Sequence, residues 1–387
     1  MHSKGAIATR LIALALLAAP LPPARGAAEL KVGEDGSLSA GLGLRTSYTR
    51  RERSAPDGTS TSNNFSVENA RLYLGGNWAK IFKATFNTER ASDDKVRVLD
   101  AIAQLELTPE FNFWLGRMLP PSDRANLYGP FYALPWSYPG VASNYPNIAA
   151  GRDNGAMLWG KPLASKIVYS LGAFDGHNKL AGLSGASDKL LYAGRVAFNI
   201  WDPEPAPAHY TGGWYGGSKD IFTIAVSGNW QKDGVGTAAV PGKLSIWSTD
   251  LLVEKPLGVG VPTFEAAYYK YKLGALDCNS GEPGAPSCLG GGDNVGGQVD
   301  GKAWLLGGGF LFPQQFGWGK LQPFVRYQKF ERTVSATTSK AWDFGVNYII
   351  RGPNAKVSLM YSKFKDNRVA APRDDIGQLV LGLQLQY

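Results

Sequence analysis

Apolar and polar residues alternate along most of this chain, most clearly at its carboxyl-terminal end. The segment DDIGQLVLGLQLQY, residues 374–387, places a large apolar residue at every second position: Leu379, Leu381, Leu383, Leu385 and Tyr387. The positions between them are mostly polar or small. A period of two residues predicts a β-strand with one apolar face and one polar face.

The same alternation recurs in many earlier segments. Clear examples are residues 37–50, 68–78, 80–90, 98–107, 220–230, 246–255, 341–350 and 355–364. Within residues 98–107, Leu99, Ala101 and Leu105 are expected on the apolar face and Asp100 on the polar face. Each segment is about nine to twelve residues long, the length that a tilted strand needs to cross a bilayer. A soluble β-sandwich would instead show strands of about five or six residues.

Connections and aromatic residues also favour a membrane barrel. Short turns such as residues 75–77, 108–110 and 351–354 alternate with long polar or glycine-rich loops such as residues 50–64 and 118–150. Several apolar stripes end on an aromatic residue, as interfacial girdles do: Tyr48, Trp78, Trp230, Trp247 and Tyr387. We therefore predict an all-β fold in which residues 27–387 form one transmembrane antiparallel β-barrel of about 16 strands.

The amino-terminal segment predicts export. Lys4 and Arg10 precede or flank the short apolar run LIALALLAAPLPPA, and residues 24–26 have the small residues of a cleavage site. We interpret residues 1–26 as a secretory signal peptide. A membrane-anchoring helix needs roughly 20 apolar residues, and prolines at positions 20, 22 and 23 interrupt this run earlier. The expected location is the outer membrane of a Gram-negative bacterium.

Charge and cysteine content exclude several classes of site. The formal charge is +8, and without Lys4, Arg10 and Arg25 it is +5, spread along the chain, so we predict no nucleic-acid partner. The only cysteines, Cys278 and Cys288, lie in a segment rich in Gly, Pro and Asn. In an exported protein such a pair predicts a disulfide that closes a loop. A metal site is not expected, because no His lies near and two thiolates alone make a poor ligand set.

Several stretches together resemble the phosphate-selective porin O and P family. They are ENARLYLGG, GRDNGAMLWGK, IVYSLGAFDG, YAGRVAFNI, AWDFGVNYIIRGPNAKVSLMYSKF and LVLGLQLQY, in this order over nearly the whole chain after the signal peptide. The resemblance implies a porin barrel of about 16 strands, usually trimeric, whose infolded third loop narrows the pore. It also implies that Lys and Arg side chains line a path for anions.

The resemblance carries over to four arginines. Arg71 and Arg195 match basic positions of the family and face the lumen by alternation, and Arg117 and Arg124 fall where the family enters its constricting loop. The centre of that loop, residues 128–146, departs from the phosphate-binding type because it contains no Lys or Arg. It carries aromatic residues instead: Tyr128, Phe131, Tyr132, Trp136, Tyr138 and Tyr145. We expect most of these rings to pack against the barrel wall and one or two to line the constriction.

The charges expected in the lumen are nearly balanced. Arg45, Arg71, Lys83, Arg195 and Arg326 are opposed by Glu89, Asp100, Glu106, Asp250 and Asp343. Such pairs either satisfy one another across the lumen or create a transverse field that orients dipolar solutes, and the sequence leaves both readings open. The complete predicted pore-lining set is Arg45, Arg71, Lys83, Asp100, Arg117, Arg124, Tyr128, Tyr132, Arg195 and Arg326.

An outer-membrane enzyme is the second hypothesis, and the sequence argues against it. Beyond the signal peptide the histidines are His177 and His209, and neither accompanies an evident serine nucleophile motif. A CxxCH motif is absent, so we expect no c-type haem and no other cofactor. A third hypothesis, a sleeve around an exported electron carrier, conflicts with the space that about 16 strands and an infolded loop would leave.

Passive diffusion through an outer-membrane porin is therefore the predicted function. Small, preferentially anionic solutes are expected to pass, with phosphate left open. A channel for organic or aromatic solutes or sugars is the alternative. The expected partners are these solutes, outer-membrane lipid and further copies of the chain in a homotrimer.

Overall fold

The computed structural model describes residues 28–91, 94–143, 151–176, 189–236, 241–273, 300–333, 337–366 and 373–387. The predicted signal peptide, residues 1–26, and the predicted Cys278–Cys288 disulfide lie outside these residues. Tyr145 and His177 lie outside them as well. Within the described ranges, no helix is long and apolar enough to cross a membrane.

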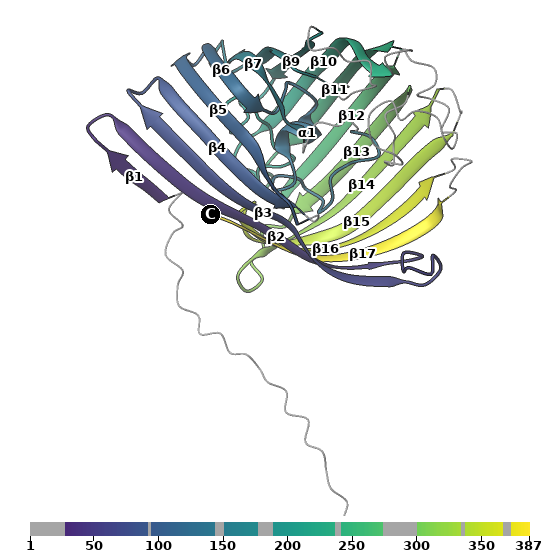
Figure 1. The fold of residues 1–387 in the computed structure, drawn as a ribbon. Helices are drawn as coiled ribbons and strands as arrows, with labels where there is room; N and C mark the ends of the chain where they lie inside the picture. Colours follow the sequence, from purple (N-terminus) through teal and green to yellow (C-terminus); the bar gives the residue numbers. More distant parts are fainter. Residues whose placement is uncertain are drawn as a thin grey trace, which may run out of the picture.

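The strands β2 to β17 form a closed antiparallel barrel of 16 strands (Figure 1). Each pairs with the next along the chain, and β17 pairs with β2 to close the ring. An additional strand, β1, pairs with the start of β2. The bounds are β1 Ala28–Val32, β2 Gly36–Arg51, β3 Ser62–Trp78, β4 Phe82–Ala91, β5 Val96–Thr108, β6 Phe111–Met118, β7 Asp153–Gly160, β8 Ile167–Phe174, β9 Leu191–Asn199, β10 Ile221–Gly236, β11 Pro241–Glu254, β12 Val261–Leu273, β13 Gly301–Leu311, β14 Lys320–Arg332, β15 Thr338–Arg351, β16 Ala355–Asp366 and β17 Arg373–Gln386. The predicted barrel of about 16 strands is confirmed.

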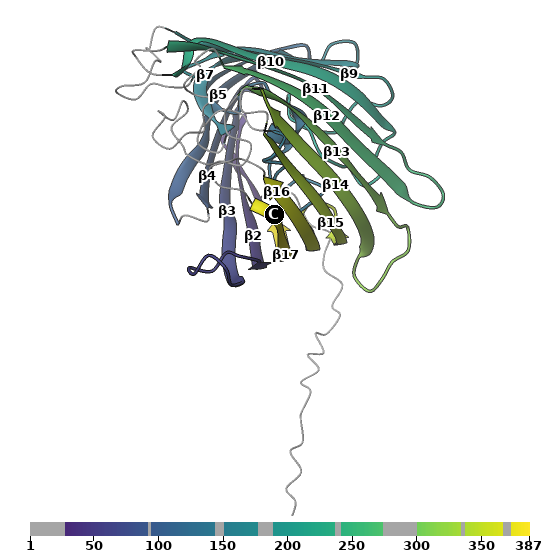
Figure 2. The same cartoon turned by 90° about the vertical axis from the view of Figure 1, so that its right-hand side faces the viewer.

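The apolar faces of the strands point outward. In β17, Leu381 is 49% exposed, whereas Gln384 on the other face is fully buried inside the barrel. Leu42 and Leu72 pair directly opposite each other in β2 and β3, and both are exposed. Figure 2 shows that the strands run obliquely, as closure of a barrel requires. An outer band of apolar side chains suits a surface that lipid covers, and the register predicted for the last strand is confirmed.

One position departs from the predicted alternation. Asn87 pairs with Asp100 and Thr88 pairs with Val98, so a β-bulge leaves Leu99 without an opposite residue. Leu99 and Asp100 are 2% and 3% exposed, whereas Val98 is 40% exposed. The prediction that Leu99 lies on the outer apolar face was therefore wrong. The extra residue of the bulge lets two consecutive side chains turn away from the outer surface.

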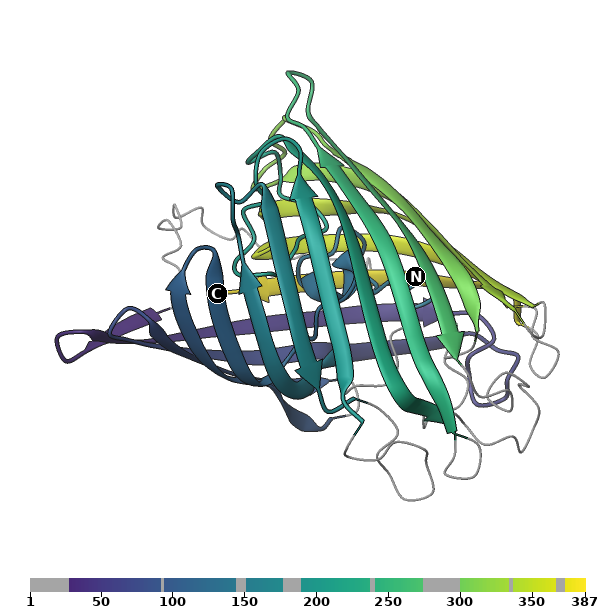
Figure 3. The same cartoon turned by 90° about the horizontal axis from the view of Figure 1, so that it is seen from above.

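The connection between β6 and β7 folds into the barrel, and we call its residues 119–143 the inner loop. It contains the short helix α1, Arg124–Tyr128, which lies inside the ring of strands in Figure 1 and, seen from above, in Figure 3. Asp123 caps this helix by accepting a hydrogen bond from the Asn126 N–H. The hydroxyl of Tyr269, on β12, donates to the other carboxylate oxygen at 2.7 Å. The helix is therefore tied to the far wall of the barrel.

Glycines of the wall make room for the aromatic rings of the inner loop. A Cβ atom on Gly43 would lie 2.9 Å from the Phe131 ring. On Gly382 it would lie 2.6 Å from the Trp136 indole. These distances are shorter than carbon contacts in packed interiors, so each glycine is required by the loop that covers it.

A second segment enters the barrel from the opposite end. Residues 200–220 join β9 to β10, and we call them the inner turn. Connections at this end are otherwise short, as at residues 79–81 and 352–354. The Gly213 N–H of the inner turn donates to the Tyr132 carbonyl oxygen of the inner loop at 3.0 Å. The two inward segments therefore meet inside the barrel.

An apolar cluster inside the barrel joins both segments to the wall. It contains Leu134 and Trp136 from the inner loop, Trp214 from the inner turn, and one buried residue from each of β13 to β17: Leu311, Phe324, Ile349, Met360 and Val380. Because these side chains contact one another away from water, the cluster holds the inner loop against one half of the barrel. The opposite half, around β3 to β5, is left to line open space.

Candidate pore and its constriction

A cavity of about 770 Å³ lies inside the barrel, bordered by the inner loop and the inner turn. Its polar side is the inner face of β3 to β5, whose side chains point inward by the alternation described above. The charged residues that line it are Arg71, Lys83, Asp100, Glu106 and Arg152. This space is the candidate path for a solute.

Each cation of this polar wall has a carboxylate neighbour. The pairs are Lys83 with Glu106, Arg152 with Asp100 and Arg71 with Glu89. Glu89 does not line the cavity, so three cationic groups and two carboxylates do, an excess of one positive charge. The Lys83 side chain is 37% exposed, against 10% for Arg152. Lys83 is therefore the cation of this wall most open to a solute.

The side facing this wall is aromatic and rich in proline. It is formed by Pro205, Pro207, Tyr210 and Trp214 of the inner turn and by Tyr128 and Tyr132 of the inner loop. Tyr132 is 41% exposed. The Trp159 and Trp214 indole nitrogens and the Tyr128 hydroxyl are buried and have no hydrogen-bond partner among the described residues. All three belong to residues that line the cavity, but the polar atoms themselves are buried, so the cavity meets the rings of these residues.

Side chains of the opposite half of the barrel hold the backbone of the inner loop. Five of its carbonyl oxygens accept a hydrogen bond from β2 or from β14 to β17: Phe131 from Gln384, Ala133 from Lys356, Leu134 from Asn347, Trp136 from Arg45 and Ser137 from Arg326. A loop buried in a barrel needs such partners, because an unpaired buried carbonyl costs about as much as a lost hydrogen bond. Several polar side chains of the lumen therefore serve to fix the loop.

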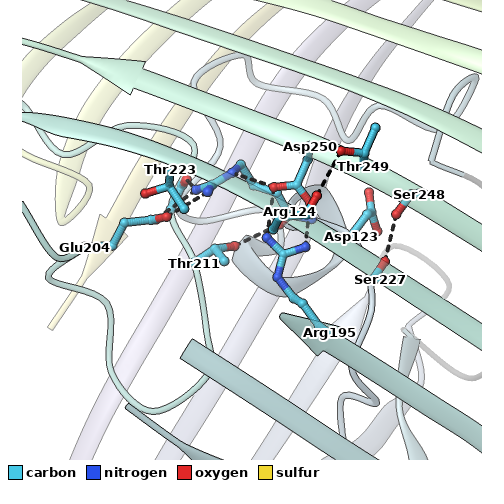
Figure 4. A network of polar contacts seen from close by, with 12 residues as sticks. Asp123, Arg124, Arg195, Glu204, Thr211, Thr223, Ser227, Ser248, Thr249 and Asp250 are labelled. Atoms are coloured by element: carbon cyan, nitrogen blue, oxygen red, sulfur yellow. Dashed lines mark hydrogen bonds and ion pairs between the residues drawn. The ribbon is translucent and has the colours of Figure 1, made fainter. Parts of the chain in front are cut away.

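A buried network of charges joins the inner loop to the inner turn and the wall (Figure 4). Arg124 makes two parallel hydrogen bonds to Glu204 of the inner turn, at 2.8 and 2.7 Å. Its Nε lies 3.2 Å from Asp250 of β11, and Arg195 of β9 binds the same carboxylate at 2.8 Å. Arg124 is 1% exposed. Because these charges are paired in two directions, breaking one pair would leave an uncompensated buried charge.

Burial and pairing shift the pKa values of Asp123, Arg124 and Glu204 in the inward segments. Burial disfavours the charged forms of Arg124 and Glu204, but their mutual attraction outweighs it, so the pKa of Arg124 lies well above and that of Glu204 below its usual value. Burial also raises the pKa of Asp123 to about 6. The Arg124–Glu204 pair therefore stays charged at neutral pH. Asp123, in contrast, gains or loses its proton at a pH close to neutral.

His209 of the inner turn is buried against the Trp114 ring, with 5.6 Å between ring centroids. Burial, with Arg195 and Lys161 nearby, lowers the pKa of His209 to about 3. An imidazole with such a low pKa is a weak proton acceptor. Its place in the fold is that of a packing residue.

Comparisons with known proteins agree with this architecture. The model of the family described as "Phosphate-selective porin O and P" matches residues 295–387. No curated protein matches the chain. Among solved structures, the chain is similar to a loop L8 deletion mutant of OmpT, an outer membrane protein of Vibrio cholerae. The two are 13% identical with a TM-score of 0.57, over 92% of this chain and 100% of that one.

Two further porins align over a similar span. The anion-selective porin from Comamonas acidovorans is 13% identical, with a TM-score of 0.59 over 91% of this chain and 100% of that one. OmpF of Salmonella typhi, in complex with daunomycin, is 11% identical, with a TM-score of 0.60 over 93% of this chain and 100% of that one. The fold is that of an outer-membrane porin. The resemblance to porin O and P is confirmed for residues 295–387.

Within this porin fold, the predicted site residues fall into three groups. Arg71, Lys83, Asp100, Tyr128 and Tyr132 line the cavity. Arg45, Arg124, Arg195 and Arg326 are buried, at 1–3% exposure, and bind the inner loop or its neighbours instead of facing the cavity. Arg117 stands apart from both groups.

Arg117 belongs to the outer face of the porin barrel. It pairs directly opposite Ala101, an exposed position of β5, and shares the face of Phe113 and Leu115. Its guanidinium bonds to the Val98 carbonyl at 3.0 Å. The family resemblance suggested a place at the constriction, whereas the alternation along β6 already indicates an outward position.

Sequence reasoning missed Arg152, Glu204 and the inner turn. Arg152 follows a part of the loop that has no basic residue, and no alternation marks its direction. The inner turn begins with DPEPAPAHY, a composition that indicates a loop but not whether it folds into the barrel or away from it. The ion pair with Arg124 shows that Glu204 is an interior residue.

Proposed function

We propose that this chain is an outer-membrane porin that lets small, preferentially anionic solutes diffuse through the cavity beside the inner loop. The observation that carries the proposal is a closed barrel with an apolar outer surface and an internal cavity of about 770 Å³ with a charged wall. A cavity of this size takes a small organic molecule or a hydrated ion. The apolar outer surface and the porin fold support the outer membrane as its location.

The preference for anions is expected to be modest. Three cations and two carboxylates line the cavity, and each cation has a carboxylate beside it. Tight binding of phosphate requires several charge-assisted donors that converge on one point. Arg124 and Arg195, which the family resemblance suggested for this role, already bind Glu204 and Asp250. The charges of the wall thus favour weak anion selectivity and do not form a dedicated phosphate site.

Conductance in planar bilayers tests this proposal. In a gradient of a chloride salt, the reversal potential should move from zero toward the equilibrium potential of chloride. Lys83→Gln should reduce the displacement, because it removes the cation most open to the cavity. Lys363→Gln, which changes an exposed lysine paired with Asp375, is the matched control and should leave the potential unchanged. Cation selectivity of the wild type, or submillimolar block by phosphate, would contradict the proposal.

A second candidate function is favoured by the aromatic side of the cavity. Flat rings, of which Tyr132 is 41% exposed, suit a neutral organic solute or a sugar that can stack on an aromatic face. Liposome swelling with sugars and with uncharged aromatic solutes tests it. Tyr132→Leu removes the exposed ring of this side and should slow the permeation of such solutes without changing that of chloride.

We further propose a homotrimer. The porin O and P resemblance supports it, and OmpT of Vibrio cholerae has been described in a trimer form. Crosslinking of detergent-solubilised protein should give a band of three chains that dissociates on heating. A sedimenting species of a single chain in mild detergent would contradict the trimer without bearing on the pore.

A further inference from the structure

We infer that the inner turn, residues 200–220, forms a second half of the constriction and fixes the position of the inner loop through Glu204. This inference rests on the proposed channel function and goes beyond it, because it assigns part of the pore geometry to a segment from the short-turn end. In this reading the narrowest region is built from both ends of the barrel. Selectivity by size would then depend on a connection that is not one of the long loops.

The inner turn is anchored on two sides of the barrel. Lys161, in the turn between β7 and β8, donates through Nζ to the Ala206 carbonyl at 2.7 Å. At its other end, the N–H groups of Tyr215 and Gly217 donate to the Glu254 carboxylate at 2.9 and 2.8 Å. Glu254, the last residue of β11, is fully buried. A segment fastened at both sides spans the interior and does not hang from one strand.

The inner turn also binds Arg124 of the inner loop through three of its residues. The guanidinium makes a bidentate bond to Glu204 and a further bond to the Gly212 carbonyl at 3.0 Å. The Thr211 hydroxyl donates to the Arg124 carbonyl at 3.0 Å. The Tyr215 hydroxyl donates to Glu204 and orients that carboxylate. Charge-assisted bidentate bonds fix direction as well as distance, so the inner turn sets where α1 lies in the lumen.

The two segments are also in close backbone contact. An added Cβ on Gly213 would lie 3.1 Å from the Tyr132 oxygen and 3.3 Å from the Leu134 nitrogen. Ala206, Tyr210 and Ser218 of the inner turn line the cavity. Removing the segment would therefore take away both a wall of the cavity and one support of the inner loop.

Thiol accessibility tests whether the inner turn lines the conducting path. Ser218 is exposed and lines the cavity, whereas its exposed neighbour Lys219 does not. A positively charged methanethiosulfonate reagent, added at the short-turn side, should lower the single-channel conductance of Ser218→Cys and leave that of Lys219→Cys unchanged. The wild type is the control for its own two cysteines. Equal responses of the two variants would overturn the assignment of the turn to the pore wall.

Shortening the turn tests its role in setting pore size. Replacement of residues 205–213 by Gly-Ser-Gly should give a larger conductance step and admit larger sugars in liposome swelling. Glu204→Gln, which keeps the shape but removes the charge that holds Arg124, should shift the conductance in the same direction by less. Lys363→Gln, which removes an exposed ion pair to Asp375 away from the inner turn, is the control and should conduct as the wild type does.

The outcomes separate this inference from the proposed function. A wild type without channel activity would refute the proposed function. A conducting wild type, with a Glu204→Gln variant that migrates as a folded barrel and has unchanged conductance and size limit, would refute the inference alone. If the shortened variant does not assemble, Glu204→Gln and the two cysteine variants still decide the question, because each changes a single side chain.

Discussion

Gly382 of β17 offers the sharpest test of how the wall accommodates the inner loop. A Cβ atom at this position would lie 2.6 Å from the Trp136 indole. The ring is 2% exposed and cannot turn away freely, because its nitrogen donates to Glu68 at 2.9 Å and Arg45 lies over its face at 4.0 Å. Gly382→Ala therefore forces a shift of the ring, of the strand or of both.

The expected cost follows from these contacts. Overpacking of a well-packed interior destabilises by about 1–3 kcal/mol. If the ring is displaced rather than compressed, loss of a desolvated cation–π contact with Arg45 adds about 2 kcal/mol. Gly307→Ala is the matched control, because this glycine of β13 has Arg326 Cγ as its nearest neighbour at 3.7 Å, an ordinary van der Waals distance.

Urea unfolding of the protein reconstituted in lipid vesicles, followed by tryptophan fluorescence, measures the free energy of unfolding of both variants. Both substitutions restrict the unfolded chain in the same way, so the comparison cancels that effect. Gly382→Ala should be less stable than Gly307→Ala by about 1–3 kcal/mol. Equal stabilities would refute the reasoning that the inner loop is pressed against this glycine.

Two further predictions concern the outer face and the helix cap. Leu381→Arg should destabilise the barrel by about 2–4 kcal/mol if the site lies near the bilayer midplane, whereas Tyr387→Arg, at the end of the same stripe, should cost about 0–1 kcal/mol; equal unfolding free energies would refute the assigned depth. Burial raises the pKa of Asp123 from 3.8 to about 6, so the folded state binds this proton more tightly than the unfolded chain. The resulting contribution to stability is complete below the unfolded pKa of 3.8 and is lost as the pH rises through about 6. Asp123→Asn, which keeps a capping side chain, should reduce the change in unfolding free energy between these two pH values. An unchanged pH dependence would mean that another group causes it.

Alternation predicted most of the barrel because lipid on one side and polar groups on the other impose a period of two on every strand. It failed at Leu99, where a bulge inserts one residue, and a bulge has no signature in the spacing of apolar residues. The inward direction of Arg45 and Arg326 was also predictable. That the inner loop covers them was not, because it depends on hydrogen bonds between residues about 90 and 190 positions apart.

The family resemblance was least informative where the role of a residue depends on whether its side chain or segment faces into the barrel or away from it. The resemblance placed Arg117 at the constriction because it lies near the start of the loop. The alternation of β6, in which Phe113 and Leu115 face outward, predicts that Arg117 faces outward as well. Arg124 was placed in the correct loop, but its partner Glu204 belongs to a turn whose composition gives no direction. Sequence patterns thus predicted the wall of the pore better than what fills it.

One part of the barrel holds the inner loop and another part lines the cavity. Substitutions in the two parts should therefore have different effects. Substitutions on the inner face of β3 to β5 alter what a solute meets but disturb few of the bonds that position the inner loop, which come mainly from β9 to β17. Transport properties and structural integrity are therefore encoded in different stretches of the chain. Such a barrel can acquire a new solute preference through exchanges near Lys83 and Glu106 while the carboxyl-terminal strands stay constant, and a library confined to those positions is where a redesigned pore should be sought.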